Sequence, residues 1–520
     1  MTAAALTRTA AAALVVGALA LAAAPAPAQT IRFGPGIAAP TAFNPATGRY
    51  EEGSSFDPYL CAEQPCGELL HNVFEGLVAV SNKRVIEPKL ATHWQRIDDV
   101  RFRLTLRRGV VFHNDEVFDA EAARFSLLRA SEAYGATAWF PEVVRVEILD
   151  PYLVDVVLKA PDSLFLHRLS HLAPILPPNY FRQVGAARFG AQPIGTGAFR
   201  FVRWDRGRRE VLLEANPRYW REGYPKVSRV IYSYVDSEKA LEGLTQGRMD
   251  LLRRLNPRKT TQFMETGSGK IVKAWLPQLV LGPFNLLKAR TPLKDRRVRK
   301  AINLAIDRED LLRYGAIGNG RPIGGYTVPE DPDHAGLAPY PYDPAQARAL
   351  LKAAGYPNGF TLSMLVSNQV PPQVEKILAV SLAEVGIRVT VREATEADFL
   401  KELYLPKFGS GAAPSFDILL LSMPAGTLLH SGYVPMTLLY SREPNESALR
   451  DPVLDRLYEE ALRSYDGRAA SAAWKKLERY VYDNHLLLIG YQERAVFGAR
   501  ERLRFTPRTL MSFWDAYYAK

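Results

Sequence analysis

Alternating hydrophobic and polar residues predict several strands in the first half of the chain. Residues 101–106 (RFRLTL) place every second side chain on an apolar face, as expected of a strand with one face in water. Residues 143–159 hold two such runs around Asp150-Pro151, and residues 199–213 hold two more around an Asp-Arg-Gly turn. Two alternating runs separated by turn residues are typical of a β-hairpin, so we expect antiparallel strands at both places.

Helical periodicity is clearest in residues 343–355 and 297–312. The first segment opens with Asp343 and Pro344, which suit a helix N-terminus, and Gly355 can terminate it. The second segment is amphipathic: its Arg and Asp residues should face water. The residues it should bury are Val298, Ile302, Ala305 and Ile306. Strands and helices mixed in this way predict a mixed α/β (α+β) fold with a large antiparallel share.

The first 28 residues have the pattern of a secretory signal peptide. Arg8 precedes a small and apolar stretch over residues 10–23, and Ala26-Pro27-Ala28 is a cleavage site of the A-x-A type. The first cysteine is Cys61, so no lipidation cysteine follows that site. No later segment reaches the length of an uncharged transmembrane helix. We therefore expect a soluble, periplasmic protein that is not a lipoprotein.

Composition narrows the class of protein without identifying it. The chain has 520 residues, 47% hydrophobic and 23% charged, which excludes a disordered or collagen-like protein and suggests two or three domains. The formal net charge is +11, yet the basic residues are scattered among acids. Export excludes a nucleic-acid partner, so the charge reflects either background basicity, which we favour, or a mild preference for anionic solutes.

Export also favours a disulfide between Cys61 and Cys66, since thiols oxidise outside the cytoplasm. The alternative is a metal site completed by His71. A second metal candidate is the pair His167 and His171 at i,i+4 spacing, but the residues between them lack the glutamate of a zinc protease.

Catalytic motifs fail in turn. Residues 267–270 (GSGK) resemble a phosphate loop, but Met264 and Ile271 occupy positions where that loop needs Gly and Ser or Thr. No Gly-x-Ser-x-Gly elbow occurs in the sequence. We therefore expect no catalytic residue, no metal and no cofactor, and hence not an enzyme.

Four blocks of sequence, in order, carry a resemblance to a known family. They are FDPY (56–59) with LHNVFEGLV (70–78), EPKLATHW (87–94) and LRRGVVFH (106–113); PIGTGAF (193–199) with EANPRYW (214–220); DRRVRKAIN (295–303) with AIDR (305–308); and YDP (342–344) with AGYPNGF (354–360). Together they resemble family 5 extracytoplasmic solute-binding proteins of ABC importers, which include dipeptide-, oligopeptide- and nickel-binding proteins.

The resemblance implies a two-lobed, hinged binding protein with an extra subdomain in lobe I. The implied division is lobe I at 29–283 with its subdomain at about 57–190, lobe II at 284–484, a return to lobe I at 485–520, and crossings near 279–285 and 484–491. Such a protein, expected as a monomer, captures a peptide-like or other small organic solute by closing, and delivers it to permease subunits.

The expected ligand class departs from the family's peptide pattern. Peptide-binding members are similar in placing an Asp just after a lobe II strand, where it holds the ammonium group of the peptide. Here Asp417 precedes the corresponding strand, and residues 422–427 contain no acid. A buried ammonium without a counter-charge is strongly disfavoured, which argues against free-amine peptides. If the alignment is displaced, Glu443 or another acid could serve instead.

The resemblance also suggests ligand-binding residues. They are Tyr59, Leu60, Trp139, His171, Arg321, Met423, Pro424, Gly426 and Thr427. For Trp139 and Met423, ordinary core packing is an equal alternative. Alternative ligands on the same scaffold are a metal chelate or haem held by His171 or His430, an opine or an oligosaccharide. Alternatives of another class are a periplasmic hydrolase and a chaperone or sensor.

Overall fold

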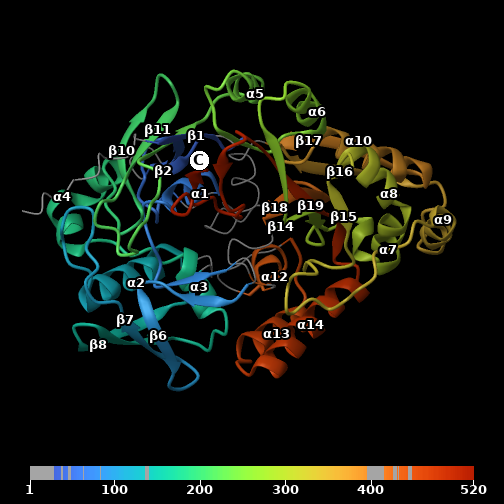
Figure 1. Ribbon diagram of the computed structural model, residues 1–520. Helices are drawn as coiled ribbons and strands as arrows, with labels where there is room; N and C mark the ends of the chain where they lie inside the picture. Colours follow the sequence, from blue (N-terminus) through green and yellow to red (C-terminus); the bar gives the residue numbers. More distant parts are fainter. Residues whose placement is uncertain are drawn as a thin grey trace, which may run out of the picture.

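The computed structural model describes residues 29–36, 39–44, 49–61, 64–81, 84–134, 140–394, 415–424, 430, 432–442 and 448–519. Two lobes lie side by side, with the N-terminal half of the chain in one and most of the C-terminal half in the other (Figure 1). This confirms the expected mixed α/β, two-lobed fold. None of the helices in the described ranges is long and apolar enough to span a bilayer.

One large mixed sheet runs through both lobes. Its centre is the antiparallel pair β14 (Lys270–Pro283) and β19 (Leu487–Ala499), which stay paired from Lys270–Ala499 to Pro283–Leu487. On the first-lobe side follow β13 (Leu251–Arg253), β1 (Thr30–Gly34), β12 (Arg229–Ser233), β11 (Glu210–Ala215) and β10 (Phe199–Asp205). On the other side follow β18 (Ile418–Pro424), β16 (Phe360–Ser367) and β17 (Ile387–Ala394), while β15 (Gly320–Pro322) pairs with β19. The chain therefore passes between the lobes along two neighbouring strands.

The first lobe also carries a four-stranded antiparallel sheet in the order β6-β7-β9-β8. Its strands are β6 (Ala91–Arg96), β7 (Arg101–Leu106), β8 (Val143–Asp150) and β9 (Leu153–Leu158). The strand expected at 101–106 and both expected hairpins are confirmed, because β8 pairs with β9 and β10 pairs with β11. In β7 the alternate residues Phe102, Leu104 and Leu106 are buried, which is the period that predicted the strand.

Shorter elements complete the first lobe. The strands are β2 (Thr41–Asn44), β3 (Arg49–Glu52), β4 (Val78–Val80), β5 (Ile86–Pro88), β20 (Leu503–Arg504) and β21 (Tyr517–Tyr518). The helices are α1 (Gln64–Leu70), α2 (Ala120–Tyr134), α3 (Phe165–His171), α4 (Pro178–Ala191), α5 (Ser237–Thr245) and α6 (Pro257–Glu265). Cys61 and Cys66 form a disulfide with a Cα–Cα distance of 5.4 Å, as the sequence predicted.

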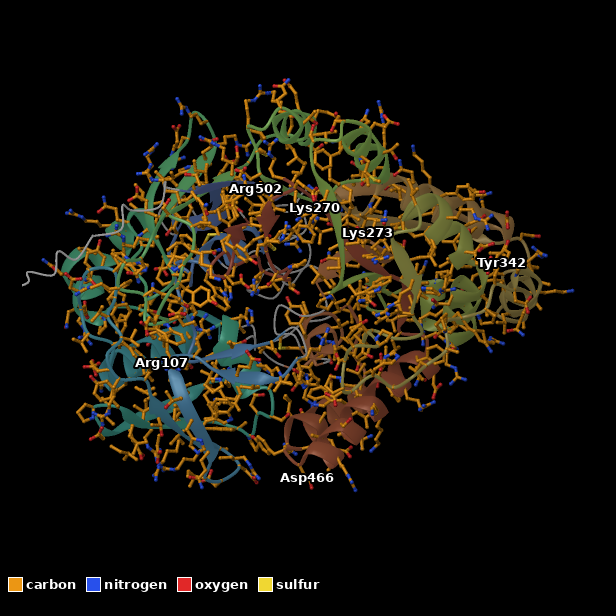
Figure 2. All side chains as sticks on the ribbon, viewed as in Figure 1. Arg107, Lys270, Lys273, Tyr342, Asp466 and Arg502 are labelled. Carbon is orange, nitrogen blue, oxygen red and sulfur yellow. A yellow bond between two sulfur atoms is a disulfide. The ribbon has the colours of Figure 1, made fainter. Side chains whose placement is uncertain are left out.

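The second lobe surrounds its part of the sheet with helices. They are α7 (Arg296–Ala305), α8 (Arg308–Asp310), α9 (Pro344–Ala353), α10 (Pro372–Glu384), α12 (Tyr433–Leu438), α13 (Pro452–Leu462) and α14 (Gly467–Asp483), with a 3-10 turn η2 (Pro292–Lys294) and a π turn η3 (Leu311–Gly315). Asp466, which caps α14, and Tyr342, just before α9, lie on the outer rim of the molecule (Figure 2). The helix expected from Asp343 is confirmed: its carboxylate accepts from the Gln346 amide, and Gly355 has φ +94°.

The single helix expected over residues 297–312 is wrong in two respects. The apolar face is buried as predicted, but helix α7 ends at Ala305, and Ile306 is extended with φ −88° and ψ 117°. Asp307 then caps α8. Two arginines expected in water, Arg299 and Arg308, are only 5% exposed. The Arg308 guanidinium donates to the carbonyls of Asn303 and Ile489, which holds the broken helix against β19.

The lobes also touch away from the shared sheet. Leu164, at the start of α3, packs in the hydrophobic core of the second lobe. Beside it, the Ser163 amide donates to the Leu462 carbonyl at 2.8 Å. A buried ion pair joins Arg84 to Asp331 at 2.7 Å, with side chains 4% and 3% exposed. The two lobes are therefore in contact at these groups as well as through the shared sheet.

Candidate functional site

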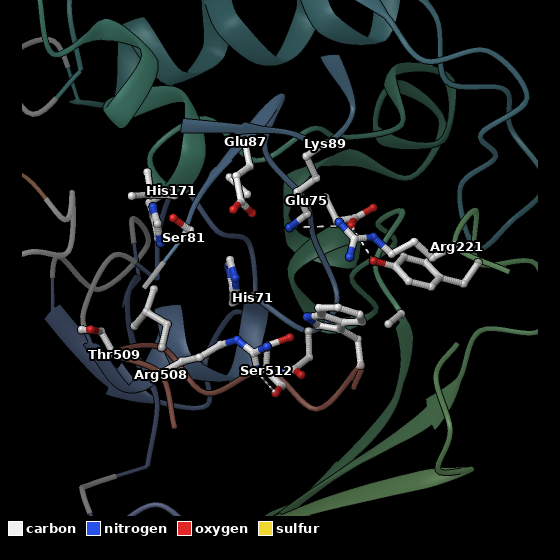
Figure 3. A pocket seen from close by; sticks show the side chains of 17 residues that line it. His71, Glu75, Ser81, Glu87, Lys89, His171, Arg221, Arg508, Thr509 and Ser512 are labelled. Carbon is white, nitrogen blue, oxygen red and sulfur yellow. Dashed lines mark hydrogen bonds and ion pairs between the residues drawn. The ribbon is translucent and has the colours of Figure 1, made fainter. Parts of the chain in front are cut away.

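A cavity of about 230 Å³ lies within the first lobe (Figure 3). Its walls come from the turn after α1, strands β4 and β5, the end of α3, residues 219–221 and residues 508–514 of the C-terminal segment. Segments from the beginning, middle and end of the chain therefore meet around one space.

Glu75 anchors one wall. Its side chain is 2% exposed and accepts from the Thr196 hydroxyl at 3.0 Å, the Tyr219 hydroxyl at 3.0 Å and the Trp220 indole at 2.9 Å. The Lys89 ammonium lies 3.6 Å from the same carboxylate. A buried carboxylate is stabilised by partners of this kind, so Glu75 has a structural role in the wall and does not present its carboxylate to the cavity.

The local sequence explains why these partners meet. Gly195 and Gly197 flank Thr196, and a side chain at either would overlap the backbone carbonyl oxygens of Asn72 and Val73. Without side chains, residues 195–197 can lie directly against the turn that carries Glu75. The motifs at 70–78, 87–94, 193–199 and 214–220 thus converge on one carboxylate.

The same wall is rich in cations. Arg221 lies 4.5 Å from the Trp514 ring and 4.9 Å from the Trp220 ring, and Arg107 covers Trp220 at 4.1 Å. Arg107 lies in the first lobe (Figure 2) and is half-buried. Burial lowers the pKa of Lys89; attraction to Glu75 raises it, and repulsion from Arg221 lowers it further. The pKa of Arg107 is also lowered, by burial and then by Arg221. These cations are therefore close enough to repel one another.

Two histidines form the opposite wall. The rings of His71 and His171 are stacked, with centroids 5.4 Å apart and planes inclined by 3°. Burial lowers the pKa of His171 to about 3, and burial, followed by Lys89, lowers that of His71 well below its ordinary value. Both imidazoles are therefore neutral at physiological pH, and they offer hydrogen bonds and a flat apolar face.

The C-terminal segment closes the cavity. The Asn72 amide group donates to the Met511 carbonyl at 2.9 Å, and its side-chain oxygen accepts from the Phe513 amide at 3.0 Å. Arg508 forms two hydrogen bonds with Asp515, at 2.5 and 2.9 Å. This wall is tied to the first lobe through backbone groups, so its position depends little on surface side chains.

Of the ligand residues expected from the sequence, only His171 lines this cavity in the described part of the chain. Tyr59 is 5% exposed, and its hydroxyl donates to the carbonyls of Ser126 and Pro174; Leu60 follows it, partly exposed. Arg321 stacks on Trp275 at 4.4 Å and donates to Gln492 in β19.

The remaining expected residues lie in or beside β18. Met423 is 9% exposed and pairs with Leu279 of β14, and Pro424 ends the strand opposite Gln278. Trp139, Gly426 and Thr427, and the alternative acid Glu443, lie outside the described residues.

Asp417 has a structural role in the second lobe. Its carboxylate accepts from the Lys288 ammonium at 2.8 Å and from the amide and hydroxyl of Ser363 at 2.8 and 2.7 Å. Burial opposes ionisation of this acid, but the hydrogen bonds outweigh it and the pKa is lowered. Asp417 is thus a charged support at the start of β18.

The cavity has little capacity for covalent chemistry. Ser170 contacts the His171 ring, but its hydroxyl donates to the His167 carbonyl at 2.6 Å. A histidine with a pKa of about 3 is a poor general base. Within the described ranges, no three His, Cys, Asp or Glu side chains are grouped so as to hold a metal ion. Binding is what this arrangement of charges, amides and rings can do.

Comparison with known proteins agrees with this geometry. The model of a family described as bacterial extracellular solute-binding proteins, family 5, middle region, matches residues 85–438, well over half of the chain. The chain belongs to this family. As a family 5 member it is a solute-binding receptor, and the resemblance of the sequence motifs is confirmed. The relatives and structural neighbours are binding proteins rather than enzymes.

Among curated relatives, the glutathione-binding protein GsiB of Pectobacterium atrosepticum is 29% identical over 346 residues, 65% of this chain and 66% of that protein. GsiB of Escherichia coli O157:H7 is 27% identical over 349 residues, 65% of this chain and 68% of that protein. The cavity residues Lys89 and Arg221 fall inside the segment matched to the family, whereas His71 and Arg508 fall outside it.

Solved structures share the family 5 fold. DppA from Helicobacter pylori, in complex with the peptide STSA, has a TM-score of 0.79 at 21% identity, covering 94% of this chain and 98% of that one. AppA from Bacillus subtilis, in complex with a nonapeptide, has a TM-score of 0.77 at 19% identity, covering 95% and 100%. At these identities the likeness concerns the fold.

Sequence reasoning missed most of the cavity. Lys89 and Glu75 stand inside motifs that carried the family resemblance, but no local pattern shows that they face a common space. Arg221 directly follows the motif ending at Trp220, and Arg508 belongs to the C-terminal return. Residues so far apart in sequence could be brought together only by the fold.

Proposed function

We propose that this protein is a periplasmic receptor that captures a peptide-like or other small organic solute by closing its lobes, and delivers it to an ABC importer. The observation that carries the proposal is how the lobes are connected. In the described part of the chain, the covalent links between them are β14 and β19, while the other contacts are non-covalent, such as Ser163–Leu462, Arg84–Asp331 and the hydrogen bond between Asp162 and Tyr465. Such a connection permits opening without unfolding either lobe.

The paired strands offer places to bend. The register between β14 and β19 shifts between Trp275 and Gln278, and again between Val280 and Leu281. Irregular pairing weakens the ladder locally and increases strand twist. We infer that opening bends the two strands near these shifts. This would place the hinge at or before the crossing expected at 279–285.

A peptide-like solute is supported by the relatives. Proteins similar to this one are named for glutathione, and structural neighbours are described in complex with peptides. The lining combines charged groups, amides and aromatic rings, which suits a small polar solute with an organic backbone. The absence of an acid in residues 422–427 keeps free-amine peptides less favoured than peptides whose amine is modified or differently placed.

Export completes the proposal. Residues 1–28, read as a signal peptide, would direct the chain out of the cytoplasm, and the Cys61–Cys66 disulfide suits an oxidising compartment. An exported receptor that meets the permease at the membrane follows from this reading, and we propose that it acts as a monomer.

The test combines native mass spectrometry with small-angle scattering on the mature protein. Protein taken from its own periplasm should carry one solute per chain, and removing that solute should increase the radius of gyration, because the lobes separate. Release of a chemically altered solute would contradict a receptor role. A radius of gyration that does not change when the solute is removed would contradict closure of the lobes.

A further inference from the structure

The cavity in the first lobe holds three cationic side chains: Lys89, Arg221 and Arg508. Two of them have an acidic partner. Lys89 lies 3.6 Å from Glu75, and Arg508 is bonded twice to Asp515. Both carboxylates have further partners: Glu75 also accepts three hydrogen bonds, and Asp515 accepts one from Thr506 at 2.8 Å. Neither is therefore available to pair with Arg221 as well.

Arg221 differs from the other two. Within the described residues its guanidinium has no ion pair or side-chain hydrogen bond, and it is held by the rings of Trp220 and Trp514. Figure 3 shows it beside Lys89 and Glu75. Stacking on two indoles fixes the plane of a guanidinium while leaving its N–H groups available for an in-plane acceptor.

The rest of the lining adds little charge. His71 and His171 are neutral. Glu87 is an exposed carboxylate on β5 and appears between His171 and Lys89 in Figure 3. After the two internal pairs are counted, one positive charge remains at the inner wall, opposite one negative charge in solvent. Arg221 also lowers the pKa of Lys89 and of Arg107, so its positive charge lies close to both of these cations.

We propose that the cavity binds a carboxylate group of the transported solute, with Arg221 as its principal partner and Lys89 as a second donor. A guanidinium presents two parallel N–H groups that match the two oxygens of a carboxylate. One uncompensated positive charge suits a monoanion. A doubly charged phosphate would be neutralised only in part, and Glu87 would repel it more strongly than it repels a monoanion.

This inference deepens the proposed function and rests on it. It assigns the first lobe the task of recognising an acid, whereas Asp417 and residues 422–427 of the second lobe provide no free acid for an amine. The bound solute is then an acidic, peptide-like molecule oriented with one carboxylate in the first lobe.

The test uses two matched pools on the ligand-free mature protein, read by native mass spectrometry. One pool holds tripeptides with free C-terminal carboxylates together with glutathione; the other holds the same tripeptides amidated, together with the diethyl ester of glutathione. Wild-type protein should retain acids at least about 10-fold over their neutral counterparts, the factor expected for one charge-assisted pair.

Variants then locate the preference. Arg221→Met should bring the acid preference below about 3-fold, whereas Arg221→Lys should keep part of it, because the charge remains while the fork is lost. Arg203→Met is the matched control, since Arg203 is an exposed arginine on β10 outside the cavity, and it should behave as wild type. Thermal unfolding of each variant checks that a lost preference for acids does not result from a loss of folded protein.

Each outcome decides the matter. Equal retention of acids and neutral counterparts overturns the carboxylate site but leaves the receptor function standing. An acid preference that survives in Arg221→Met overturns the assignment to this cavity. No retention from either pool overturns both the carboxylate site and the peptide-like class of solute.

Discussion

Glu75 shows how a single residue can organise a binding site without contacting the ligand itself. Its carboxylate joins the 193–199 segment through Thr196 and the 214–220 segment through Tyr219 and Trp220, and it partly neutralises Lys89. The residues proposed to bind solute, Lys89 and Arg221, are therefore positioned by a buried acid that stands in the turn after α1.

Replacing Glu75 with Gln should destabilise the protein by about 2–4 kcal/mol, because three buried donors would compete for one oxygen and Lys89 would lose its counter-charge. Urea unfolding at pH 7 measures the difference. The matched control is Glu87→Gln, an exposed acid on the neighbouring strand, which should change the free energy of unfolding by less than about 0.5 kcal/mol. Similar losses in both variants would contradict this role for Glu75.

At the scale of elements, the crossing strands are packed closely. Gly282 in β14 pairs with Leu488 of β19 and lies against the backbone of β18, where a side chain would overlap the Leu419 carbonyl oxygen. The strand can thus enter the second lobe only if this position has no side chain.

Gly282→Ala should therefore destabilise the second lobe by about 2–4 kcal/mol, because the backbone of β14 or β18 must shift to admit a methyl group. Gly467→Ala is the control: Gly467 begins α14, and nothing lies within 4 Å of the place that a Cβ would occupy, so alanine should be neutral or slightly stabilising. Thermal unfolding of the two variants compares them. A stable Gly282→Ala protein would show that the strands are less closely packed than described.

How much the sequence predicted also differs between elements. The strand at 101–106, the two hairpins and helix α9 were predictable because their signals are local: alternation, turn residues and a capping Asp343. The break after Ala305 was not predicted, because Arg308 was expected in water, whereas its buried guanidinium reaches the Ile489 carbonyl far along the chain. The cavity was unpredictable for the same reason: of the expected ligand residues that lie in the described part of the chain, only His171 lines it.

The contact between Arg84 and Asp331 belongs to the scale of the whole molecule. Arg84 lies between β4 and β5 of the first lobe and Asp331 in the second, and both side chains are almost fully buried. Burial raises the pKa of Asp331 to about 6, against the attraction of Arg84, which lowers it. The pair therefore holds the lobes together at a considerable desolvation cost.

Arg84→Met should leave Asp331 buried without its counter-charge, and should weaken solute binding at pH 7 by about 10-fold or more, because the closed arrangement becomes less favourable. Asp331 has a folded pKa above its unfolded value, so protonation favours the folded, buried state as the pH falls through about 6. The defect of Arg84→Met should therefore shrink between pH 7 and pH 5.

Isothermal titration at both pH values measures this effect with any solute that the wild-type protein binds. The double variant Arg84→Met with Asp331→Leu, which removes both charges, should recover most of the affinity at pH 7. A defect that is independent of pH, or that is deeper in the double variant, would show that the pair does not control closure.

The order in which the chain is made gives the shared sheet a further consequence. Strand β19 lies between β13 and β14, residues 508–514 close the cavity, and the Tyr518 hydroxyl donates to the Thr30 carbonyl at 3.1 Å. The first lobe thus joins β1 to residues that are made 488 positions later in the chain. Strands β13 and β14 lack their common neighbour until β19 has been made, so we expect the centre of the sheet to form late in synthesis rather than segment by segment.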